Sequence, residues 1–192
     1  MQIAPGDALL VVDIQNDFLP GGALGVQRGD EIIPVILAYI ETFMTRGLPI
    51  LATRDWHPAD HCSFREQGGI WPVHCVAGTE GAAPPPSFHL PPSVLMVSKA
   101  TLRDEEAYSA FEGTSLDAHL KEAAVRRLFV GGLATDYCVV NTVKDALALG
   151  YQAHVLTDAI RAVNLKPDDG VKATEEMVRA GARLVEQAQV IP

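Results

Sequence analysis

Residues 128–157 read LFVGGLATDYCVVNTVKDALALGYQAHVLT, and this stretch gives the clearest indication of the fold class. Its two apolar runs, 128–131 and 153–157, have the length and composition of strands that are buried on both faces. Residues 135–149 between them have the periodicity of a helix, and Gly150 follows, as expected for the left-handed residue that ends a helix. A strand, a helix and a second strand in this order predict a parallel βαβ unit.

The same alternation continues on both sides of this unit. Further strands are predicted at 8–12, 49–53, 94–98 and Arg183–Val185. Further helices are predicted at 30–45, 115–124 and 168–180, the first followed by Gly47 and the last by Gly181. We therefore expect an α/β fold, a three-layer α/β/α sandwich with a mostly parallel, Rossmann-like sheet of about six strands. Ligands of such sheets bind at the carboxyl ends of the strands.

The bulk properties limit the class of protein. The 192 residues suit one domain spanning 1–192, and a hydrophobic fraction of 48% is that of a folded chain. The net charge of -9 and the scattered Lys and Arg residues argue against nucleic acid as a partner. The start of the chain lacks a basic segment, and the run at 8–12 is too short for a signal sequence or a membrane span, so we expect a cytoplasmic protein that does not bind membranes. The oligomeric state stays open: a homo-oligomer is compatible with the sequence, and the Pro-rich stretch 84–92 is either an interface element or a surface loop.

The residues from about 55 to 92 depart from the alternation, because Gly and Pro interrupt them repeatedly. Loops of this length are uncommon in compact domains unless they carry function. This loop contains Asp55, His57, His61 and His74, and carboxylate together with imidazole suits zinc, iron(II) or manganese. We therefore predict a metal-binding crossover loop. The alternative is that Asp55 and His57 only shape a turn.

Polar residues follow the carboxyl ends of the first four predicted strands: Asp13, Asp55, Lys99 and Cys138. Each residue alone has an ordinary structural explanation, but their shared position favours a site. Cys138 lies near the start of a helix, with Thr135 as the expected N-cap. At this position the helix dipole favours a thiolate, and free backbone amides are available to hold an oxyanion. The alternative is a small buried side chain, since free cysteines are often buried.

A thiol nucleophile needs a group that takes its proton and returns it to the leaving amine. Asp13 suits this role if burial raises its pKa, and Lys99 would balance the charges of thiolate and carboxylate. Three aromatic residues, Phe18, Trp71 and Tyr108, are candidates to hold a flat ring by stacking and edge contacts. For Phe18 and Tyr108, packing in the core is an equally good explanation.

Taken together, these segments resemble the nicotinamidase and pyrazinamidase family of the isochorismatase-like cysteine hydrolases. The resemblance covers nearly the whole chain. It rests on six motifs: VVDIQNDF at 11–18, DWHP at 55–58 with His61, WPVHC at 71–75, KAT at 99–101, YSAF at 108–111 and GLATDYCV at 132–139. In combination these motifs are highly specific.

The resemblance implies a role for each residue of the catalytic set. Cys138 would attack the carboxamide, Asp13 would accept and return protons, and Lys99 would support both electrostatically. The backbone amides of Ala134 and Cys138 would form the oxyanion hole, with a cis peptide between Leu133 and Ala134. The substrate pocket is expected to be lined by Phe18, Trp71, Tyr108, Leu133, Ala134 and Tyr137.

The resemblance also implies one divalent metal ion, which would hold the ring nitrogen of the substrate, and no organic cofactor. Its ligands would be Asp55, His57 and His74, and His61 matches a further ligand present in some members. Zinc is the expected ion, with iron or manganese as alternatives. The expected reaction converts nicotinamide to nicotinate and ammonia through a cysteine thioester, as a step of NAD salvage, with pyrazinamide as a second substrate.

Three other functions compete with this interpretation. One is a metal-independent isochorismatase-like hydrolase, or another small-amide amidase of the same fold. The second is a dinucleotide-binding oxidoreductase, which the sequence disfavours because Asp13 and Ile14 stand where a G-x-G-x-x-G loop would follow the first strand. The third is a binding protein without catalysis on the same scaffold, which would bind a ligand without releasing ammonia.

Overall fold

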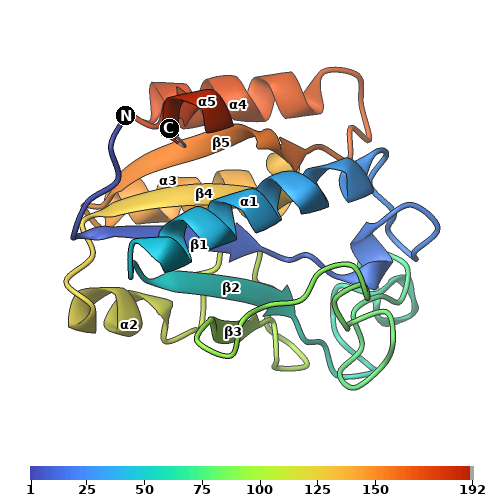
Figure 1. Ribbon diagram of the computed structural model, residues 1–192. Helices are drawn as coiled ribbons and strands as arrows, with labels where there is room; N and C mark the ends of the chain where they lie inside the picture. The colour runs from blue at the N-terminus through green and yellow to red at the C-terminus, as the bar shows by residue number, and fades with distance from the viewer. Residues whose placement is uncertain (191–192) are drawn as a thin grey trace.

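The computed structural model describes residues 1–190 and contains a single sheet in that range (Figure 1). Its six strands are β1 (Asp7–Val12), β2 (Ile50–Asp55), β3 (Leu95–Lys99), β4 (Arg127–Leu133), β5 (Gln152–Arg161) and β6 (Arg183–Val185). The order across the sheet is β3-β2-β1-β4-β5-β6, and all neighbouring strands are parallel. The predicted α/β fold with a parallel sheet of about six strands is confirmed.

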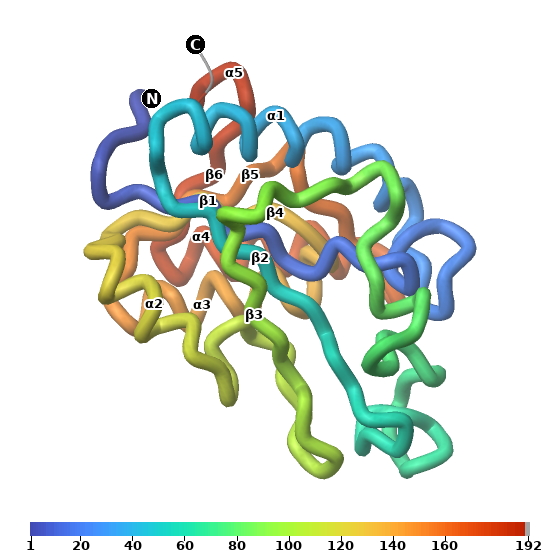
Figure 2. Tube along the Cα trace, turned by 60° about the horizontal axis from the view of Figure 1, so that its bottom comes forward, coloured from blue at the N-terminus to red at the C-terminus, as the bar shows by residue number. Residues whose placement is uncertain are grey.

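Helices cover both faces of the sheet and make the three predicted layers. They are α1 (Ile32–Thr45), α2 (Leu116–Glu122), α3 (Val140–Ala148), α4 (Asp169–Arg179) and α5 (Gln187–Val190). In Figures 1 and 2, α1 and α5 lie on one face, and α2, α3 and α4 lie on the other. Gly47, Gly150 and Gly181 follow α1, α3 and α4 with φ values of 63°, 92° and 111°, as expected for residues that end helices.

Two apolar cores explain why the strands read as continuous hydrophobic runs. Leu9 and Val11 of β1 belong to the core under α1, whereas Leu10 and Val12 belong to the core under α2, α3 and α4. Successive side chains of a strand point to opposite faces, so a strand with helices on both sides needs apolar residues at every position. The pattern that predicted the strands is therefore a direct consequence of the three layers.

The boundaries around the predicted nucleophile differ from those expected from the sequence. β4 continues to Leu133, two residues beyond the predicted end at Gly131, so Gly132 and Leu133 are also strand residues. Gly132 has φ +129°, and a Cβ there would overlap the carbonyl oxygen of Val12, which explains why glycine is needed where β4 approaches β1.

The helix predicted at 135–149 is divided into a π-helical turn, Thr135–Val139, and α3. The prediction of Thr135 as N-cap is wrong. The capping position is Ala134, which has extended backbone angles and makes no side-chain capping bond, so Thr135 already belongs to the turn.

The crossover between β2 and β3 is irregular, as predicted. Apart from the short 3-10 turn Arg65–Gln67, it is held by two isolated bridges, His57 with Val76 and Phe64 with Trp71. Figure 1 places it beyond the carboxyl ends of the strands, next to the segment that follows β1.

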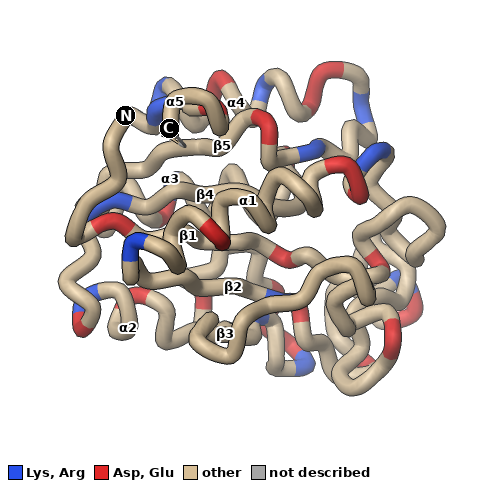
Figure 3. Tube along the Cα trace, viewed as in Figure 1, with Lys and Arg blue, Asp and Glu red and all other residues tan. Residues whose placement is uncertain are grey.

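Basic and acidic residues are spread along the described chain (Figure 3). Within residues 1–190, none of the helices has the length and apolar character needed to cross a membrane.

Candidate active site

The carboxyl ends of four parallel strands bring the predicted polar residues together. Asp13 directly follows β1, Asp55 ends β2, Lys99 ends β3 and Cys138 lies in the turn after β4. Asp55 and Lys99 are direct partners in the β2–β3 register. All four side chains are buried, and Asp13 and Lys99 are at most 1% exposed. The four side chains that the sequence placed at one edge of the sheet lie together in the structure.

The ammonium group of Lys99 is the centre of the cluster. Its Nζ lies 3.1 Å from Asp13 Oδ2 and 3.4 Å from Cys138 Sγ, and it also donates to Asp55 Oδ1. A further hydrogen bond of 3.1 Å goes to the carbonyl oxygen of Ala107. A buried cation needs such partners because burial removes its hydration, and here two carboxylates supply them.

The electrostatics of the cluster favour a protonated thiol, a lysine cation and a strengthened base. Burial raises the pKa of Asp13 above its usual value, although Lys99 acts in the opposite direction. Burial disfavours the Lys99 cation, but Asp13 and Asp55 outweigh this and hold its pKa well above the usual value. Burial also raises the pKa of Cys138 far above that of a free thiol, against the influence of Lys99. The expected stabilisation of a thiolate by the helix start is therefore outweighed, and the thiol needs a proton acceptor to react.

The turn that carries Cys138 follows a cis peptide and is closed by backbone hydrogen bonds. The peptide between Leu133 and Ala134 is cis, and the carbonyl oxygen of Ala134 accepts hydrogen bonds from the amides of Tyr137 and Val139, both at 3.1 Å. Ala134 and Cys138 both line the cavity described below. The oxyanion hole formed by their amides stays a prediction.

A second cluster offers three ligand atoms to a metal ion. Asp55, His57 and His74 each place one donor atom within 4.8 Å of the others, and all three residues are buried. Nδ1 of His57 lies 3.1 Å from the carbonyl oxygen of Ala100, and Nδ1 of His74 lies 2.8 Å from that of Pro72. Because a carbonyl oxygen only accepts, both Nδ1 atoms carry the proton and both Nε2 atoms present a lone pair.

One atom in particular fits a cation. His57 Nε2 is buried, has no hydrogen-bond partner within the described range, and lies 3.7 Å from Asp55 Oδ2. Burial opposes ionisation of Asp55, but the Lys99 ammonium outweighs it and holds its pKa below the usual value, so the carboxylate is charged. One carboxylate and two imidazoles with positions left open for water or substrate suit zinc, iron(II) or manganese.

His61 lies beside this cluster without joining it. Its ring stacks on His57 with the centroids 4.2 Å apart. Both nitrogens have other partners, since Nδ1 is 2.8 Å from Ser63 Oγ and Nε2 is 3.1 Å from the carbonyl oxygen of Glu105. In this arrangement His61 supports the ring of His57 and bridges two loops, and its role as a metal ligand stays a prediction.

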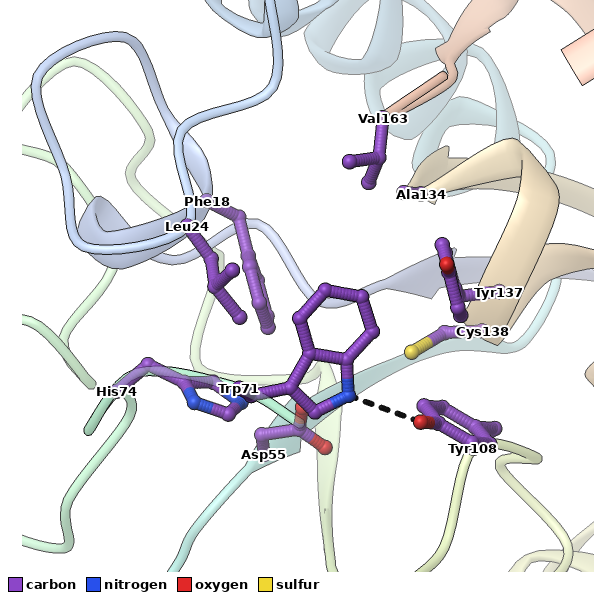
Figure 4. Close-up of a pocket in the computed structure, with 10 residues that line it drawn as sticks. All are labelled: Phe18, Leu24, Asp55, Trp71, His74, Tyr108, Ala134, Tyr137, Cys138 and Val163. Atoms are coloured by element: carbon purple, nitrogen blue, oxygen red, sulfur yellow. Dashed lines mark hydrogen bonds between the residues drawn. The ribbon is translucent and has the colours of Figure 1, made fainter. Parts of the chain in front are cut away.

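Cys138 and two of the three possible metal ligands, Asp55 and His74, line one cavity. Ten residues line it: Phe18, Leu24, Asp55, Trp71, His74, Tyr108, Ala134, Tyr137, Cys138 and Val163 (Figure 4). Figure 4 shows Asp55 and His74 at one end and Ala134 and Val163 at the other. Trp71 packs edge-on against Tyr137 at 5.0 Å and donates a hydrogen bond of 2.9 Å to the hydroxyl of Tyr108. The aromatic lining therefore suits a flat ring, and Asp55 and His74 offer polar contacts at one end.

The lining differs from the predicted pocket at three positions. Leu133 is fully buried in the core under α1, and it is not among the described residues that line the cavity. As the last residue of β4, Leu133 directs its side chain into the core under α1. Leu24 and Val163 line the cavity but were not predicted. Leu24 lies in the loop between β1 and α1, and Val163 follows β5. Neither residue type carries a chemical signature that would mark it in the sequence.

Comparisons with known proteins agree on one family. The Isochorismatase domain model matches residues 7–189. The nicotinamidase of Escherichia coli (strain K12) is 42% identical over 201 residues, which cover 94% of each chain. Among solved structures, the pyrazinamidase of Pyrococcus horikoshii in complex with zinc is 49% identical to this chain, with a TM-score of 0.91. The match covers 95% of this chain and 99% of that chain. PnC1 of L. infantum in complex with nicotinate is 33% identical, with a TM-score of 0.92, and the match covers 100% of this chain and 98% of that chain.

Proposed function

Because the chain belongs to the isochorismatase-domain family, and its relatives include nicotinamidases and pyrazinamidases, we propose that Cys138 hydrolyses nicotinamide to nicotinate and ammonia. The chain is a hydrolase that acts on an amide. The observation that carries the assignment of residues is that one cavity joins Cys138 to the cluster of Asp55 and His74. A ring nitrogen and a carboxamide need these two ends at once. Pyrazinamide, which carries the same two groups, is the second substrate.

In the first half of the reaction, the thiol proton moves from Cys138 to Asp13, and Sγ forms a bond to the carboxamide carbon. The negative charge on the carbonyl oxygen is held by the backbone amides of Ala134 and Cys138. The C–N bond then breaks, and Asp13 returns its proton to the leaving amine, which departs as ammonia. Lys99 stabilises the charged forms of thiolate and carboxylate in turn.

In the second half, Asp13 takes a proton from water as the water oxygen adds to the thioester carbon. The C–S bond breaks, nicotinate is released, and the thiolate of Cys138 recovers its proton. The raised pKa of Asp13 suits both halves, because a base with a pKa closer to neutrality both accepts and returns protons efficiently. We propose that the nicotinate serves NAD salvage.

Asp55, His57 and His74 would hold the metal ion, which when bound supplies a Lewis-acidic anchor for the ring nitrogen of the substrate. Their fit to a cation rests on His57 Nε2, which is buried without a partner in the described part of the chain, and on the charged carboxylate of Asp55. This cluster also argues against the metal-independent alternative, which has no use for a buried histidine with an unpartnered nitrogen. The ion itself is zinc, iron or manganese, and we propose zinc.

The test is ammonia release from nicotinamide by the wild type and by Cys138→Ala, with bound metal quantified in both. We expect release by the wild type alone and metal in both proteins, since Cys138 is not among the proposed ligands. Release by Cys138→Ala at a rate near that of the wild type would contradict the nucleophile. A wild type that holds metal but releases no ammonia from nicotinamide or pyrazinamide would contradict the substrate.

A further inference from the structure

The segment after β1 carries two polar side chains that the mechanism does not use. Gln15 and Asp17 alternate with Asp13, and both turn toward the crossover loop instead of the substrate cavity. We propose that Gln15 and Asp17 are positioning residues that hold the two metal-ligating segments of the crossover loop against the segment that carries Asp13. This inference rests on the proposed metal site.

Gln15 holds the backbone of Asp55 from both sides. Its Oε1 accepts a hydrogen bond from the amide of Asp55, and its Nε2 donates to the carbonyl oxygen of Asp55, both at 2.8 Å. The second hydrogen of Nε2 goes to the carbonyl oxygen of Ala82 at 3.1 Å. Gln15 is 1% exposed, so each of these bonds forms away from water. A buried amide with all of these groups satisfied fixes the backbone of Asp55 in one place.

Asp17 holds the residue next to His74. Its Oδ2 accepts a hydrogen bond of 2.7 Å from the amide of Cys75, and its own amide donates to the carbonyl oxygen of Gly81 at 3.0 Å. A Cβ at position 81 would overlap the carboxylate of Asp17, so glycine is required for this approach. Asp17 therefore connects the backbone of the His74 segment to the turn that bears Phe18.

Together these contacts attach both metal-ligating segments to the segment that follows β1. Asp55 and His74 come from parts of the crossover far apart in the sequence, yet both are tied to residues within four positions of Asp13. Residues that support metal ligands from outside the coordination sphere commonly change metal affinity about 10- to 100-fold when they are removed. The segment that supplies the base thus also sets where the ring nitrogen is held.

The test measures zinc affinity by competition with a chromophoric chelator, together with KM and kcat for nicotinamide. Gln15→Met keeps the length of the side chain and removes all three hydrogen bonds, and we expect its zinc dissociation constant to rise about tenfold or more. KM should rise by more than kcat falls, because the nucleophile set is intact. Asp17→Ala should behave similarly, and Asp17→Asn should recover part of the affinity because its amide oxygen still accepts from Cys75.

Two controls separate positioning from general destabilisation. Asn16→Ala removes the neighbouring hydrogen bond of 2.8 Å to the carbonyl oxygen of Glu80, which holds no metal ligand. Tyr39→Phe removes the hydrogen bond to Asp158 outside the site. Both controls should bind zinc within about twofold of the wild type.

Wild-type zinc affinity in the folded Gln15→Met and Asp17→Ala variants would overturn the proposal, as would an equal loss in Tyr39→Phe. If Gln15→Met does not fold, the zinc affinities of Asp17→Ala and Asp17→Asn test the proposal. A weaker affinity in Asp17→Ala than in Asp17→Asn supports it, and wild-type affinity in Asp17→Ala overturns it. The failure of the proposed function is a different result, since the wild type itself would then bind no zinc, or Asp55→Ala would bind it normally.

Discussion

Lys99 shows how much of the site depends on a single side chain. The sequence predicted that its charge would support Asp13 and Cys138, and its Nζ contacts both. It also contacts Asp55, which the sequence assigned to the metal alone. Asp55 therefore belongs to both clusters, with one oxygen toward Lys99 and the other toward His57. At the scale of residues, the nucleophile and the metal cluster are one electrostatic unit.

Thr53 lowers the pKa of Asp13, the proposed base. Its hydroxyl donates a hydrogen bond of 2.6 Å to Asp13 Oδ1, and this bond lowers the pKa of Asp13. In Thr53→Val the charged carboxylate loses that stabilisation, so the pKa of Asp13 rises further. We expect the acid limb of the kcat/KM profile to move to higher pH by about one unit, since a hydrogen bond to a charged group contributes about 1.5 kcal/mol or more.

The measurement is the pH dependence of nicotinamide hydrolysis from pH 4 to 9. Thr42→Val is the matched control, because the hydroxyl of Thr42 bonds a carbonyl oxygen within α1. An acid limb that stays in place in Thr53→Val, or moves equally in the control, would contradict the assignment of Asp13 as the base.

His154 makes folding stability sensitive to acid. It is 2% exposed, it stacks on Phe129 at 5.1 Å, and neither ring nitrogen has a partner in the part of the chain that the structure describes. Burial, together with Arg127 and Arg183, lowers its pKa to about 4, whereas Asp7 acts in the opposite direction. The unfolded chain, with an ordinary histidine pKa of about 6.5, binds the proton more readily. Stability should therefore be complete above about pH 6.5 and fall as the pH decreases toward 4, by about 3 kcal/mol from this group.

Urea unfolding at pH 7.5 and pH 5 tests this expectation in the wild type and in His154→Leu. The variant should lose less stability between the two pH values, because its side chain has no proton to bind. His89→Leu, at an exposed position, should keep the wild-type difference. An identical pH dependence in His154→Leu would show that other groups cause the acid sensitivity.

At the scale of elements, the turn Thr135–Val139 carries both the nucleophile and a support for the cavity wall. Asp136 in this turn accepts hydrogen bonds from the amides of Val163 at 2.9 Å and Asn164 at 2.8 Å. Val163 lines the cavity at the end occupied by Ala134. The segment after β5 is thereby fixed by the same turn that positions Cys138.

Replacement of Asp136 by Ala should free the segment at Val163 and Asn164 that lines the cavity, because both hydrogen bonds to it are lost. We expect KM for nicotinamide to rise about tenfold with a smaller change in kcat, since two hydrogen bonds to a carboxylate are lost without contact to the reacting atoms. Steady-state kinetics measure both constants. Asp145→Ala, in α3 and outside the cavity lining, is the control and should keep both values. A fall in kcat alone would instead place Asp136 in the chemical step.

At the scale of the whole molecule, the metal ion would join the crossover loop to the sheet. Asp55 belongs to β2, whereas His57 and His74 belong to the loop. An ion that binds only the folded chain stabilises it by about 2.7 kcal/mol at a concentration 100 times its dissociation constant. For a chain of this size, removal of the ion should lower Tm by about 5 to 10 °C.

Thermal unfolding with and without a chelator, followed by addition of zinc, measures this effect. His57→Ala is the control, because it removes one ligand and should show no response to zinc. An unchanged Tm of the wild type after verified metal removal would contradict a role of the ion in holding the loop.

The architecture, and the meeting of the polar residues at one edge of the sheet, could be predicted from the sequence. Strands buried on both faces must be apolar at every position, and helices between them must be amphipathic, so a three-layer sheet leaves a readable pattern. Parallel strands place their carboxyl ends at one edge, which is why Asp13, Asp55, Lys99 and Cys138 could be expected to meet. Their reactive types, and the resemblance of their motifs to a known family, then indicated thiol chemistry and a metal.

The further residues around the site could not be predicted from the sequence and were found from the three-dimensional arrangement. A local sequence pattern carries no information about partners far away in the sequence. Such partners identify Gln15, which bonds Asp55, and Thr53, which bonds Asp13. They also identify Leu24 and Val163, which line the cavity. The same holds for the protonation of Cys138, because the dipole of its turn can be read locally but its burial beside two carboxylates cannot. Periodicity records which face of an element is covered, whereas hydrogen-bond partners and pKa values depend on what the fold brings to that face.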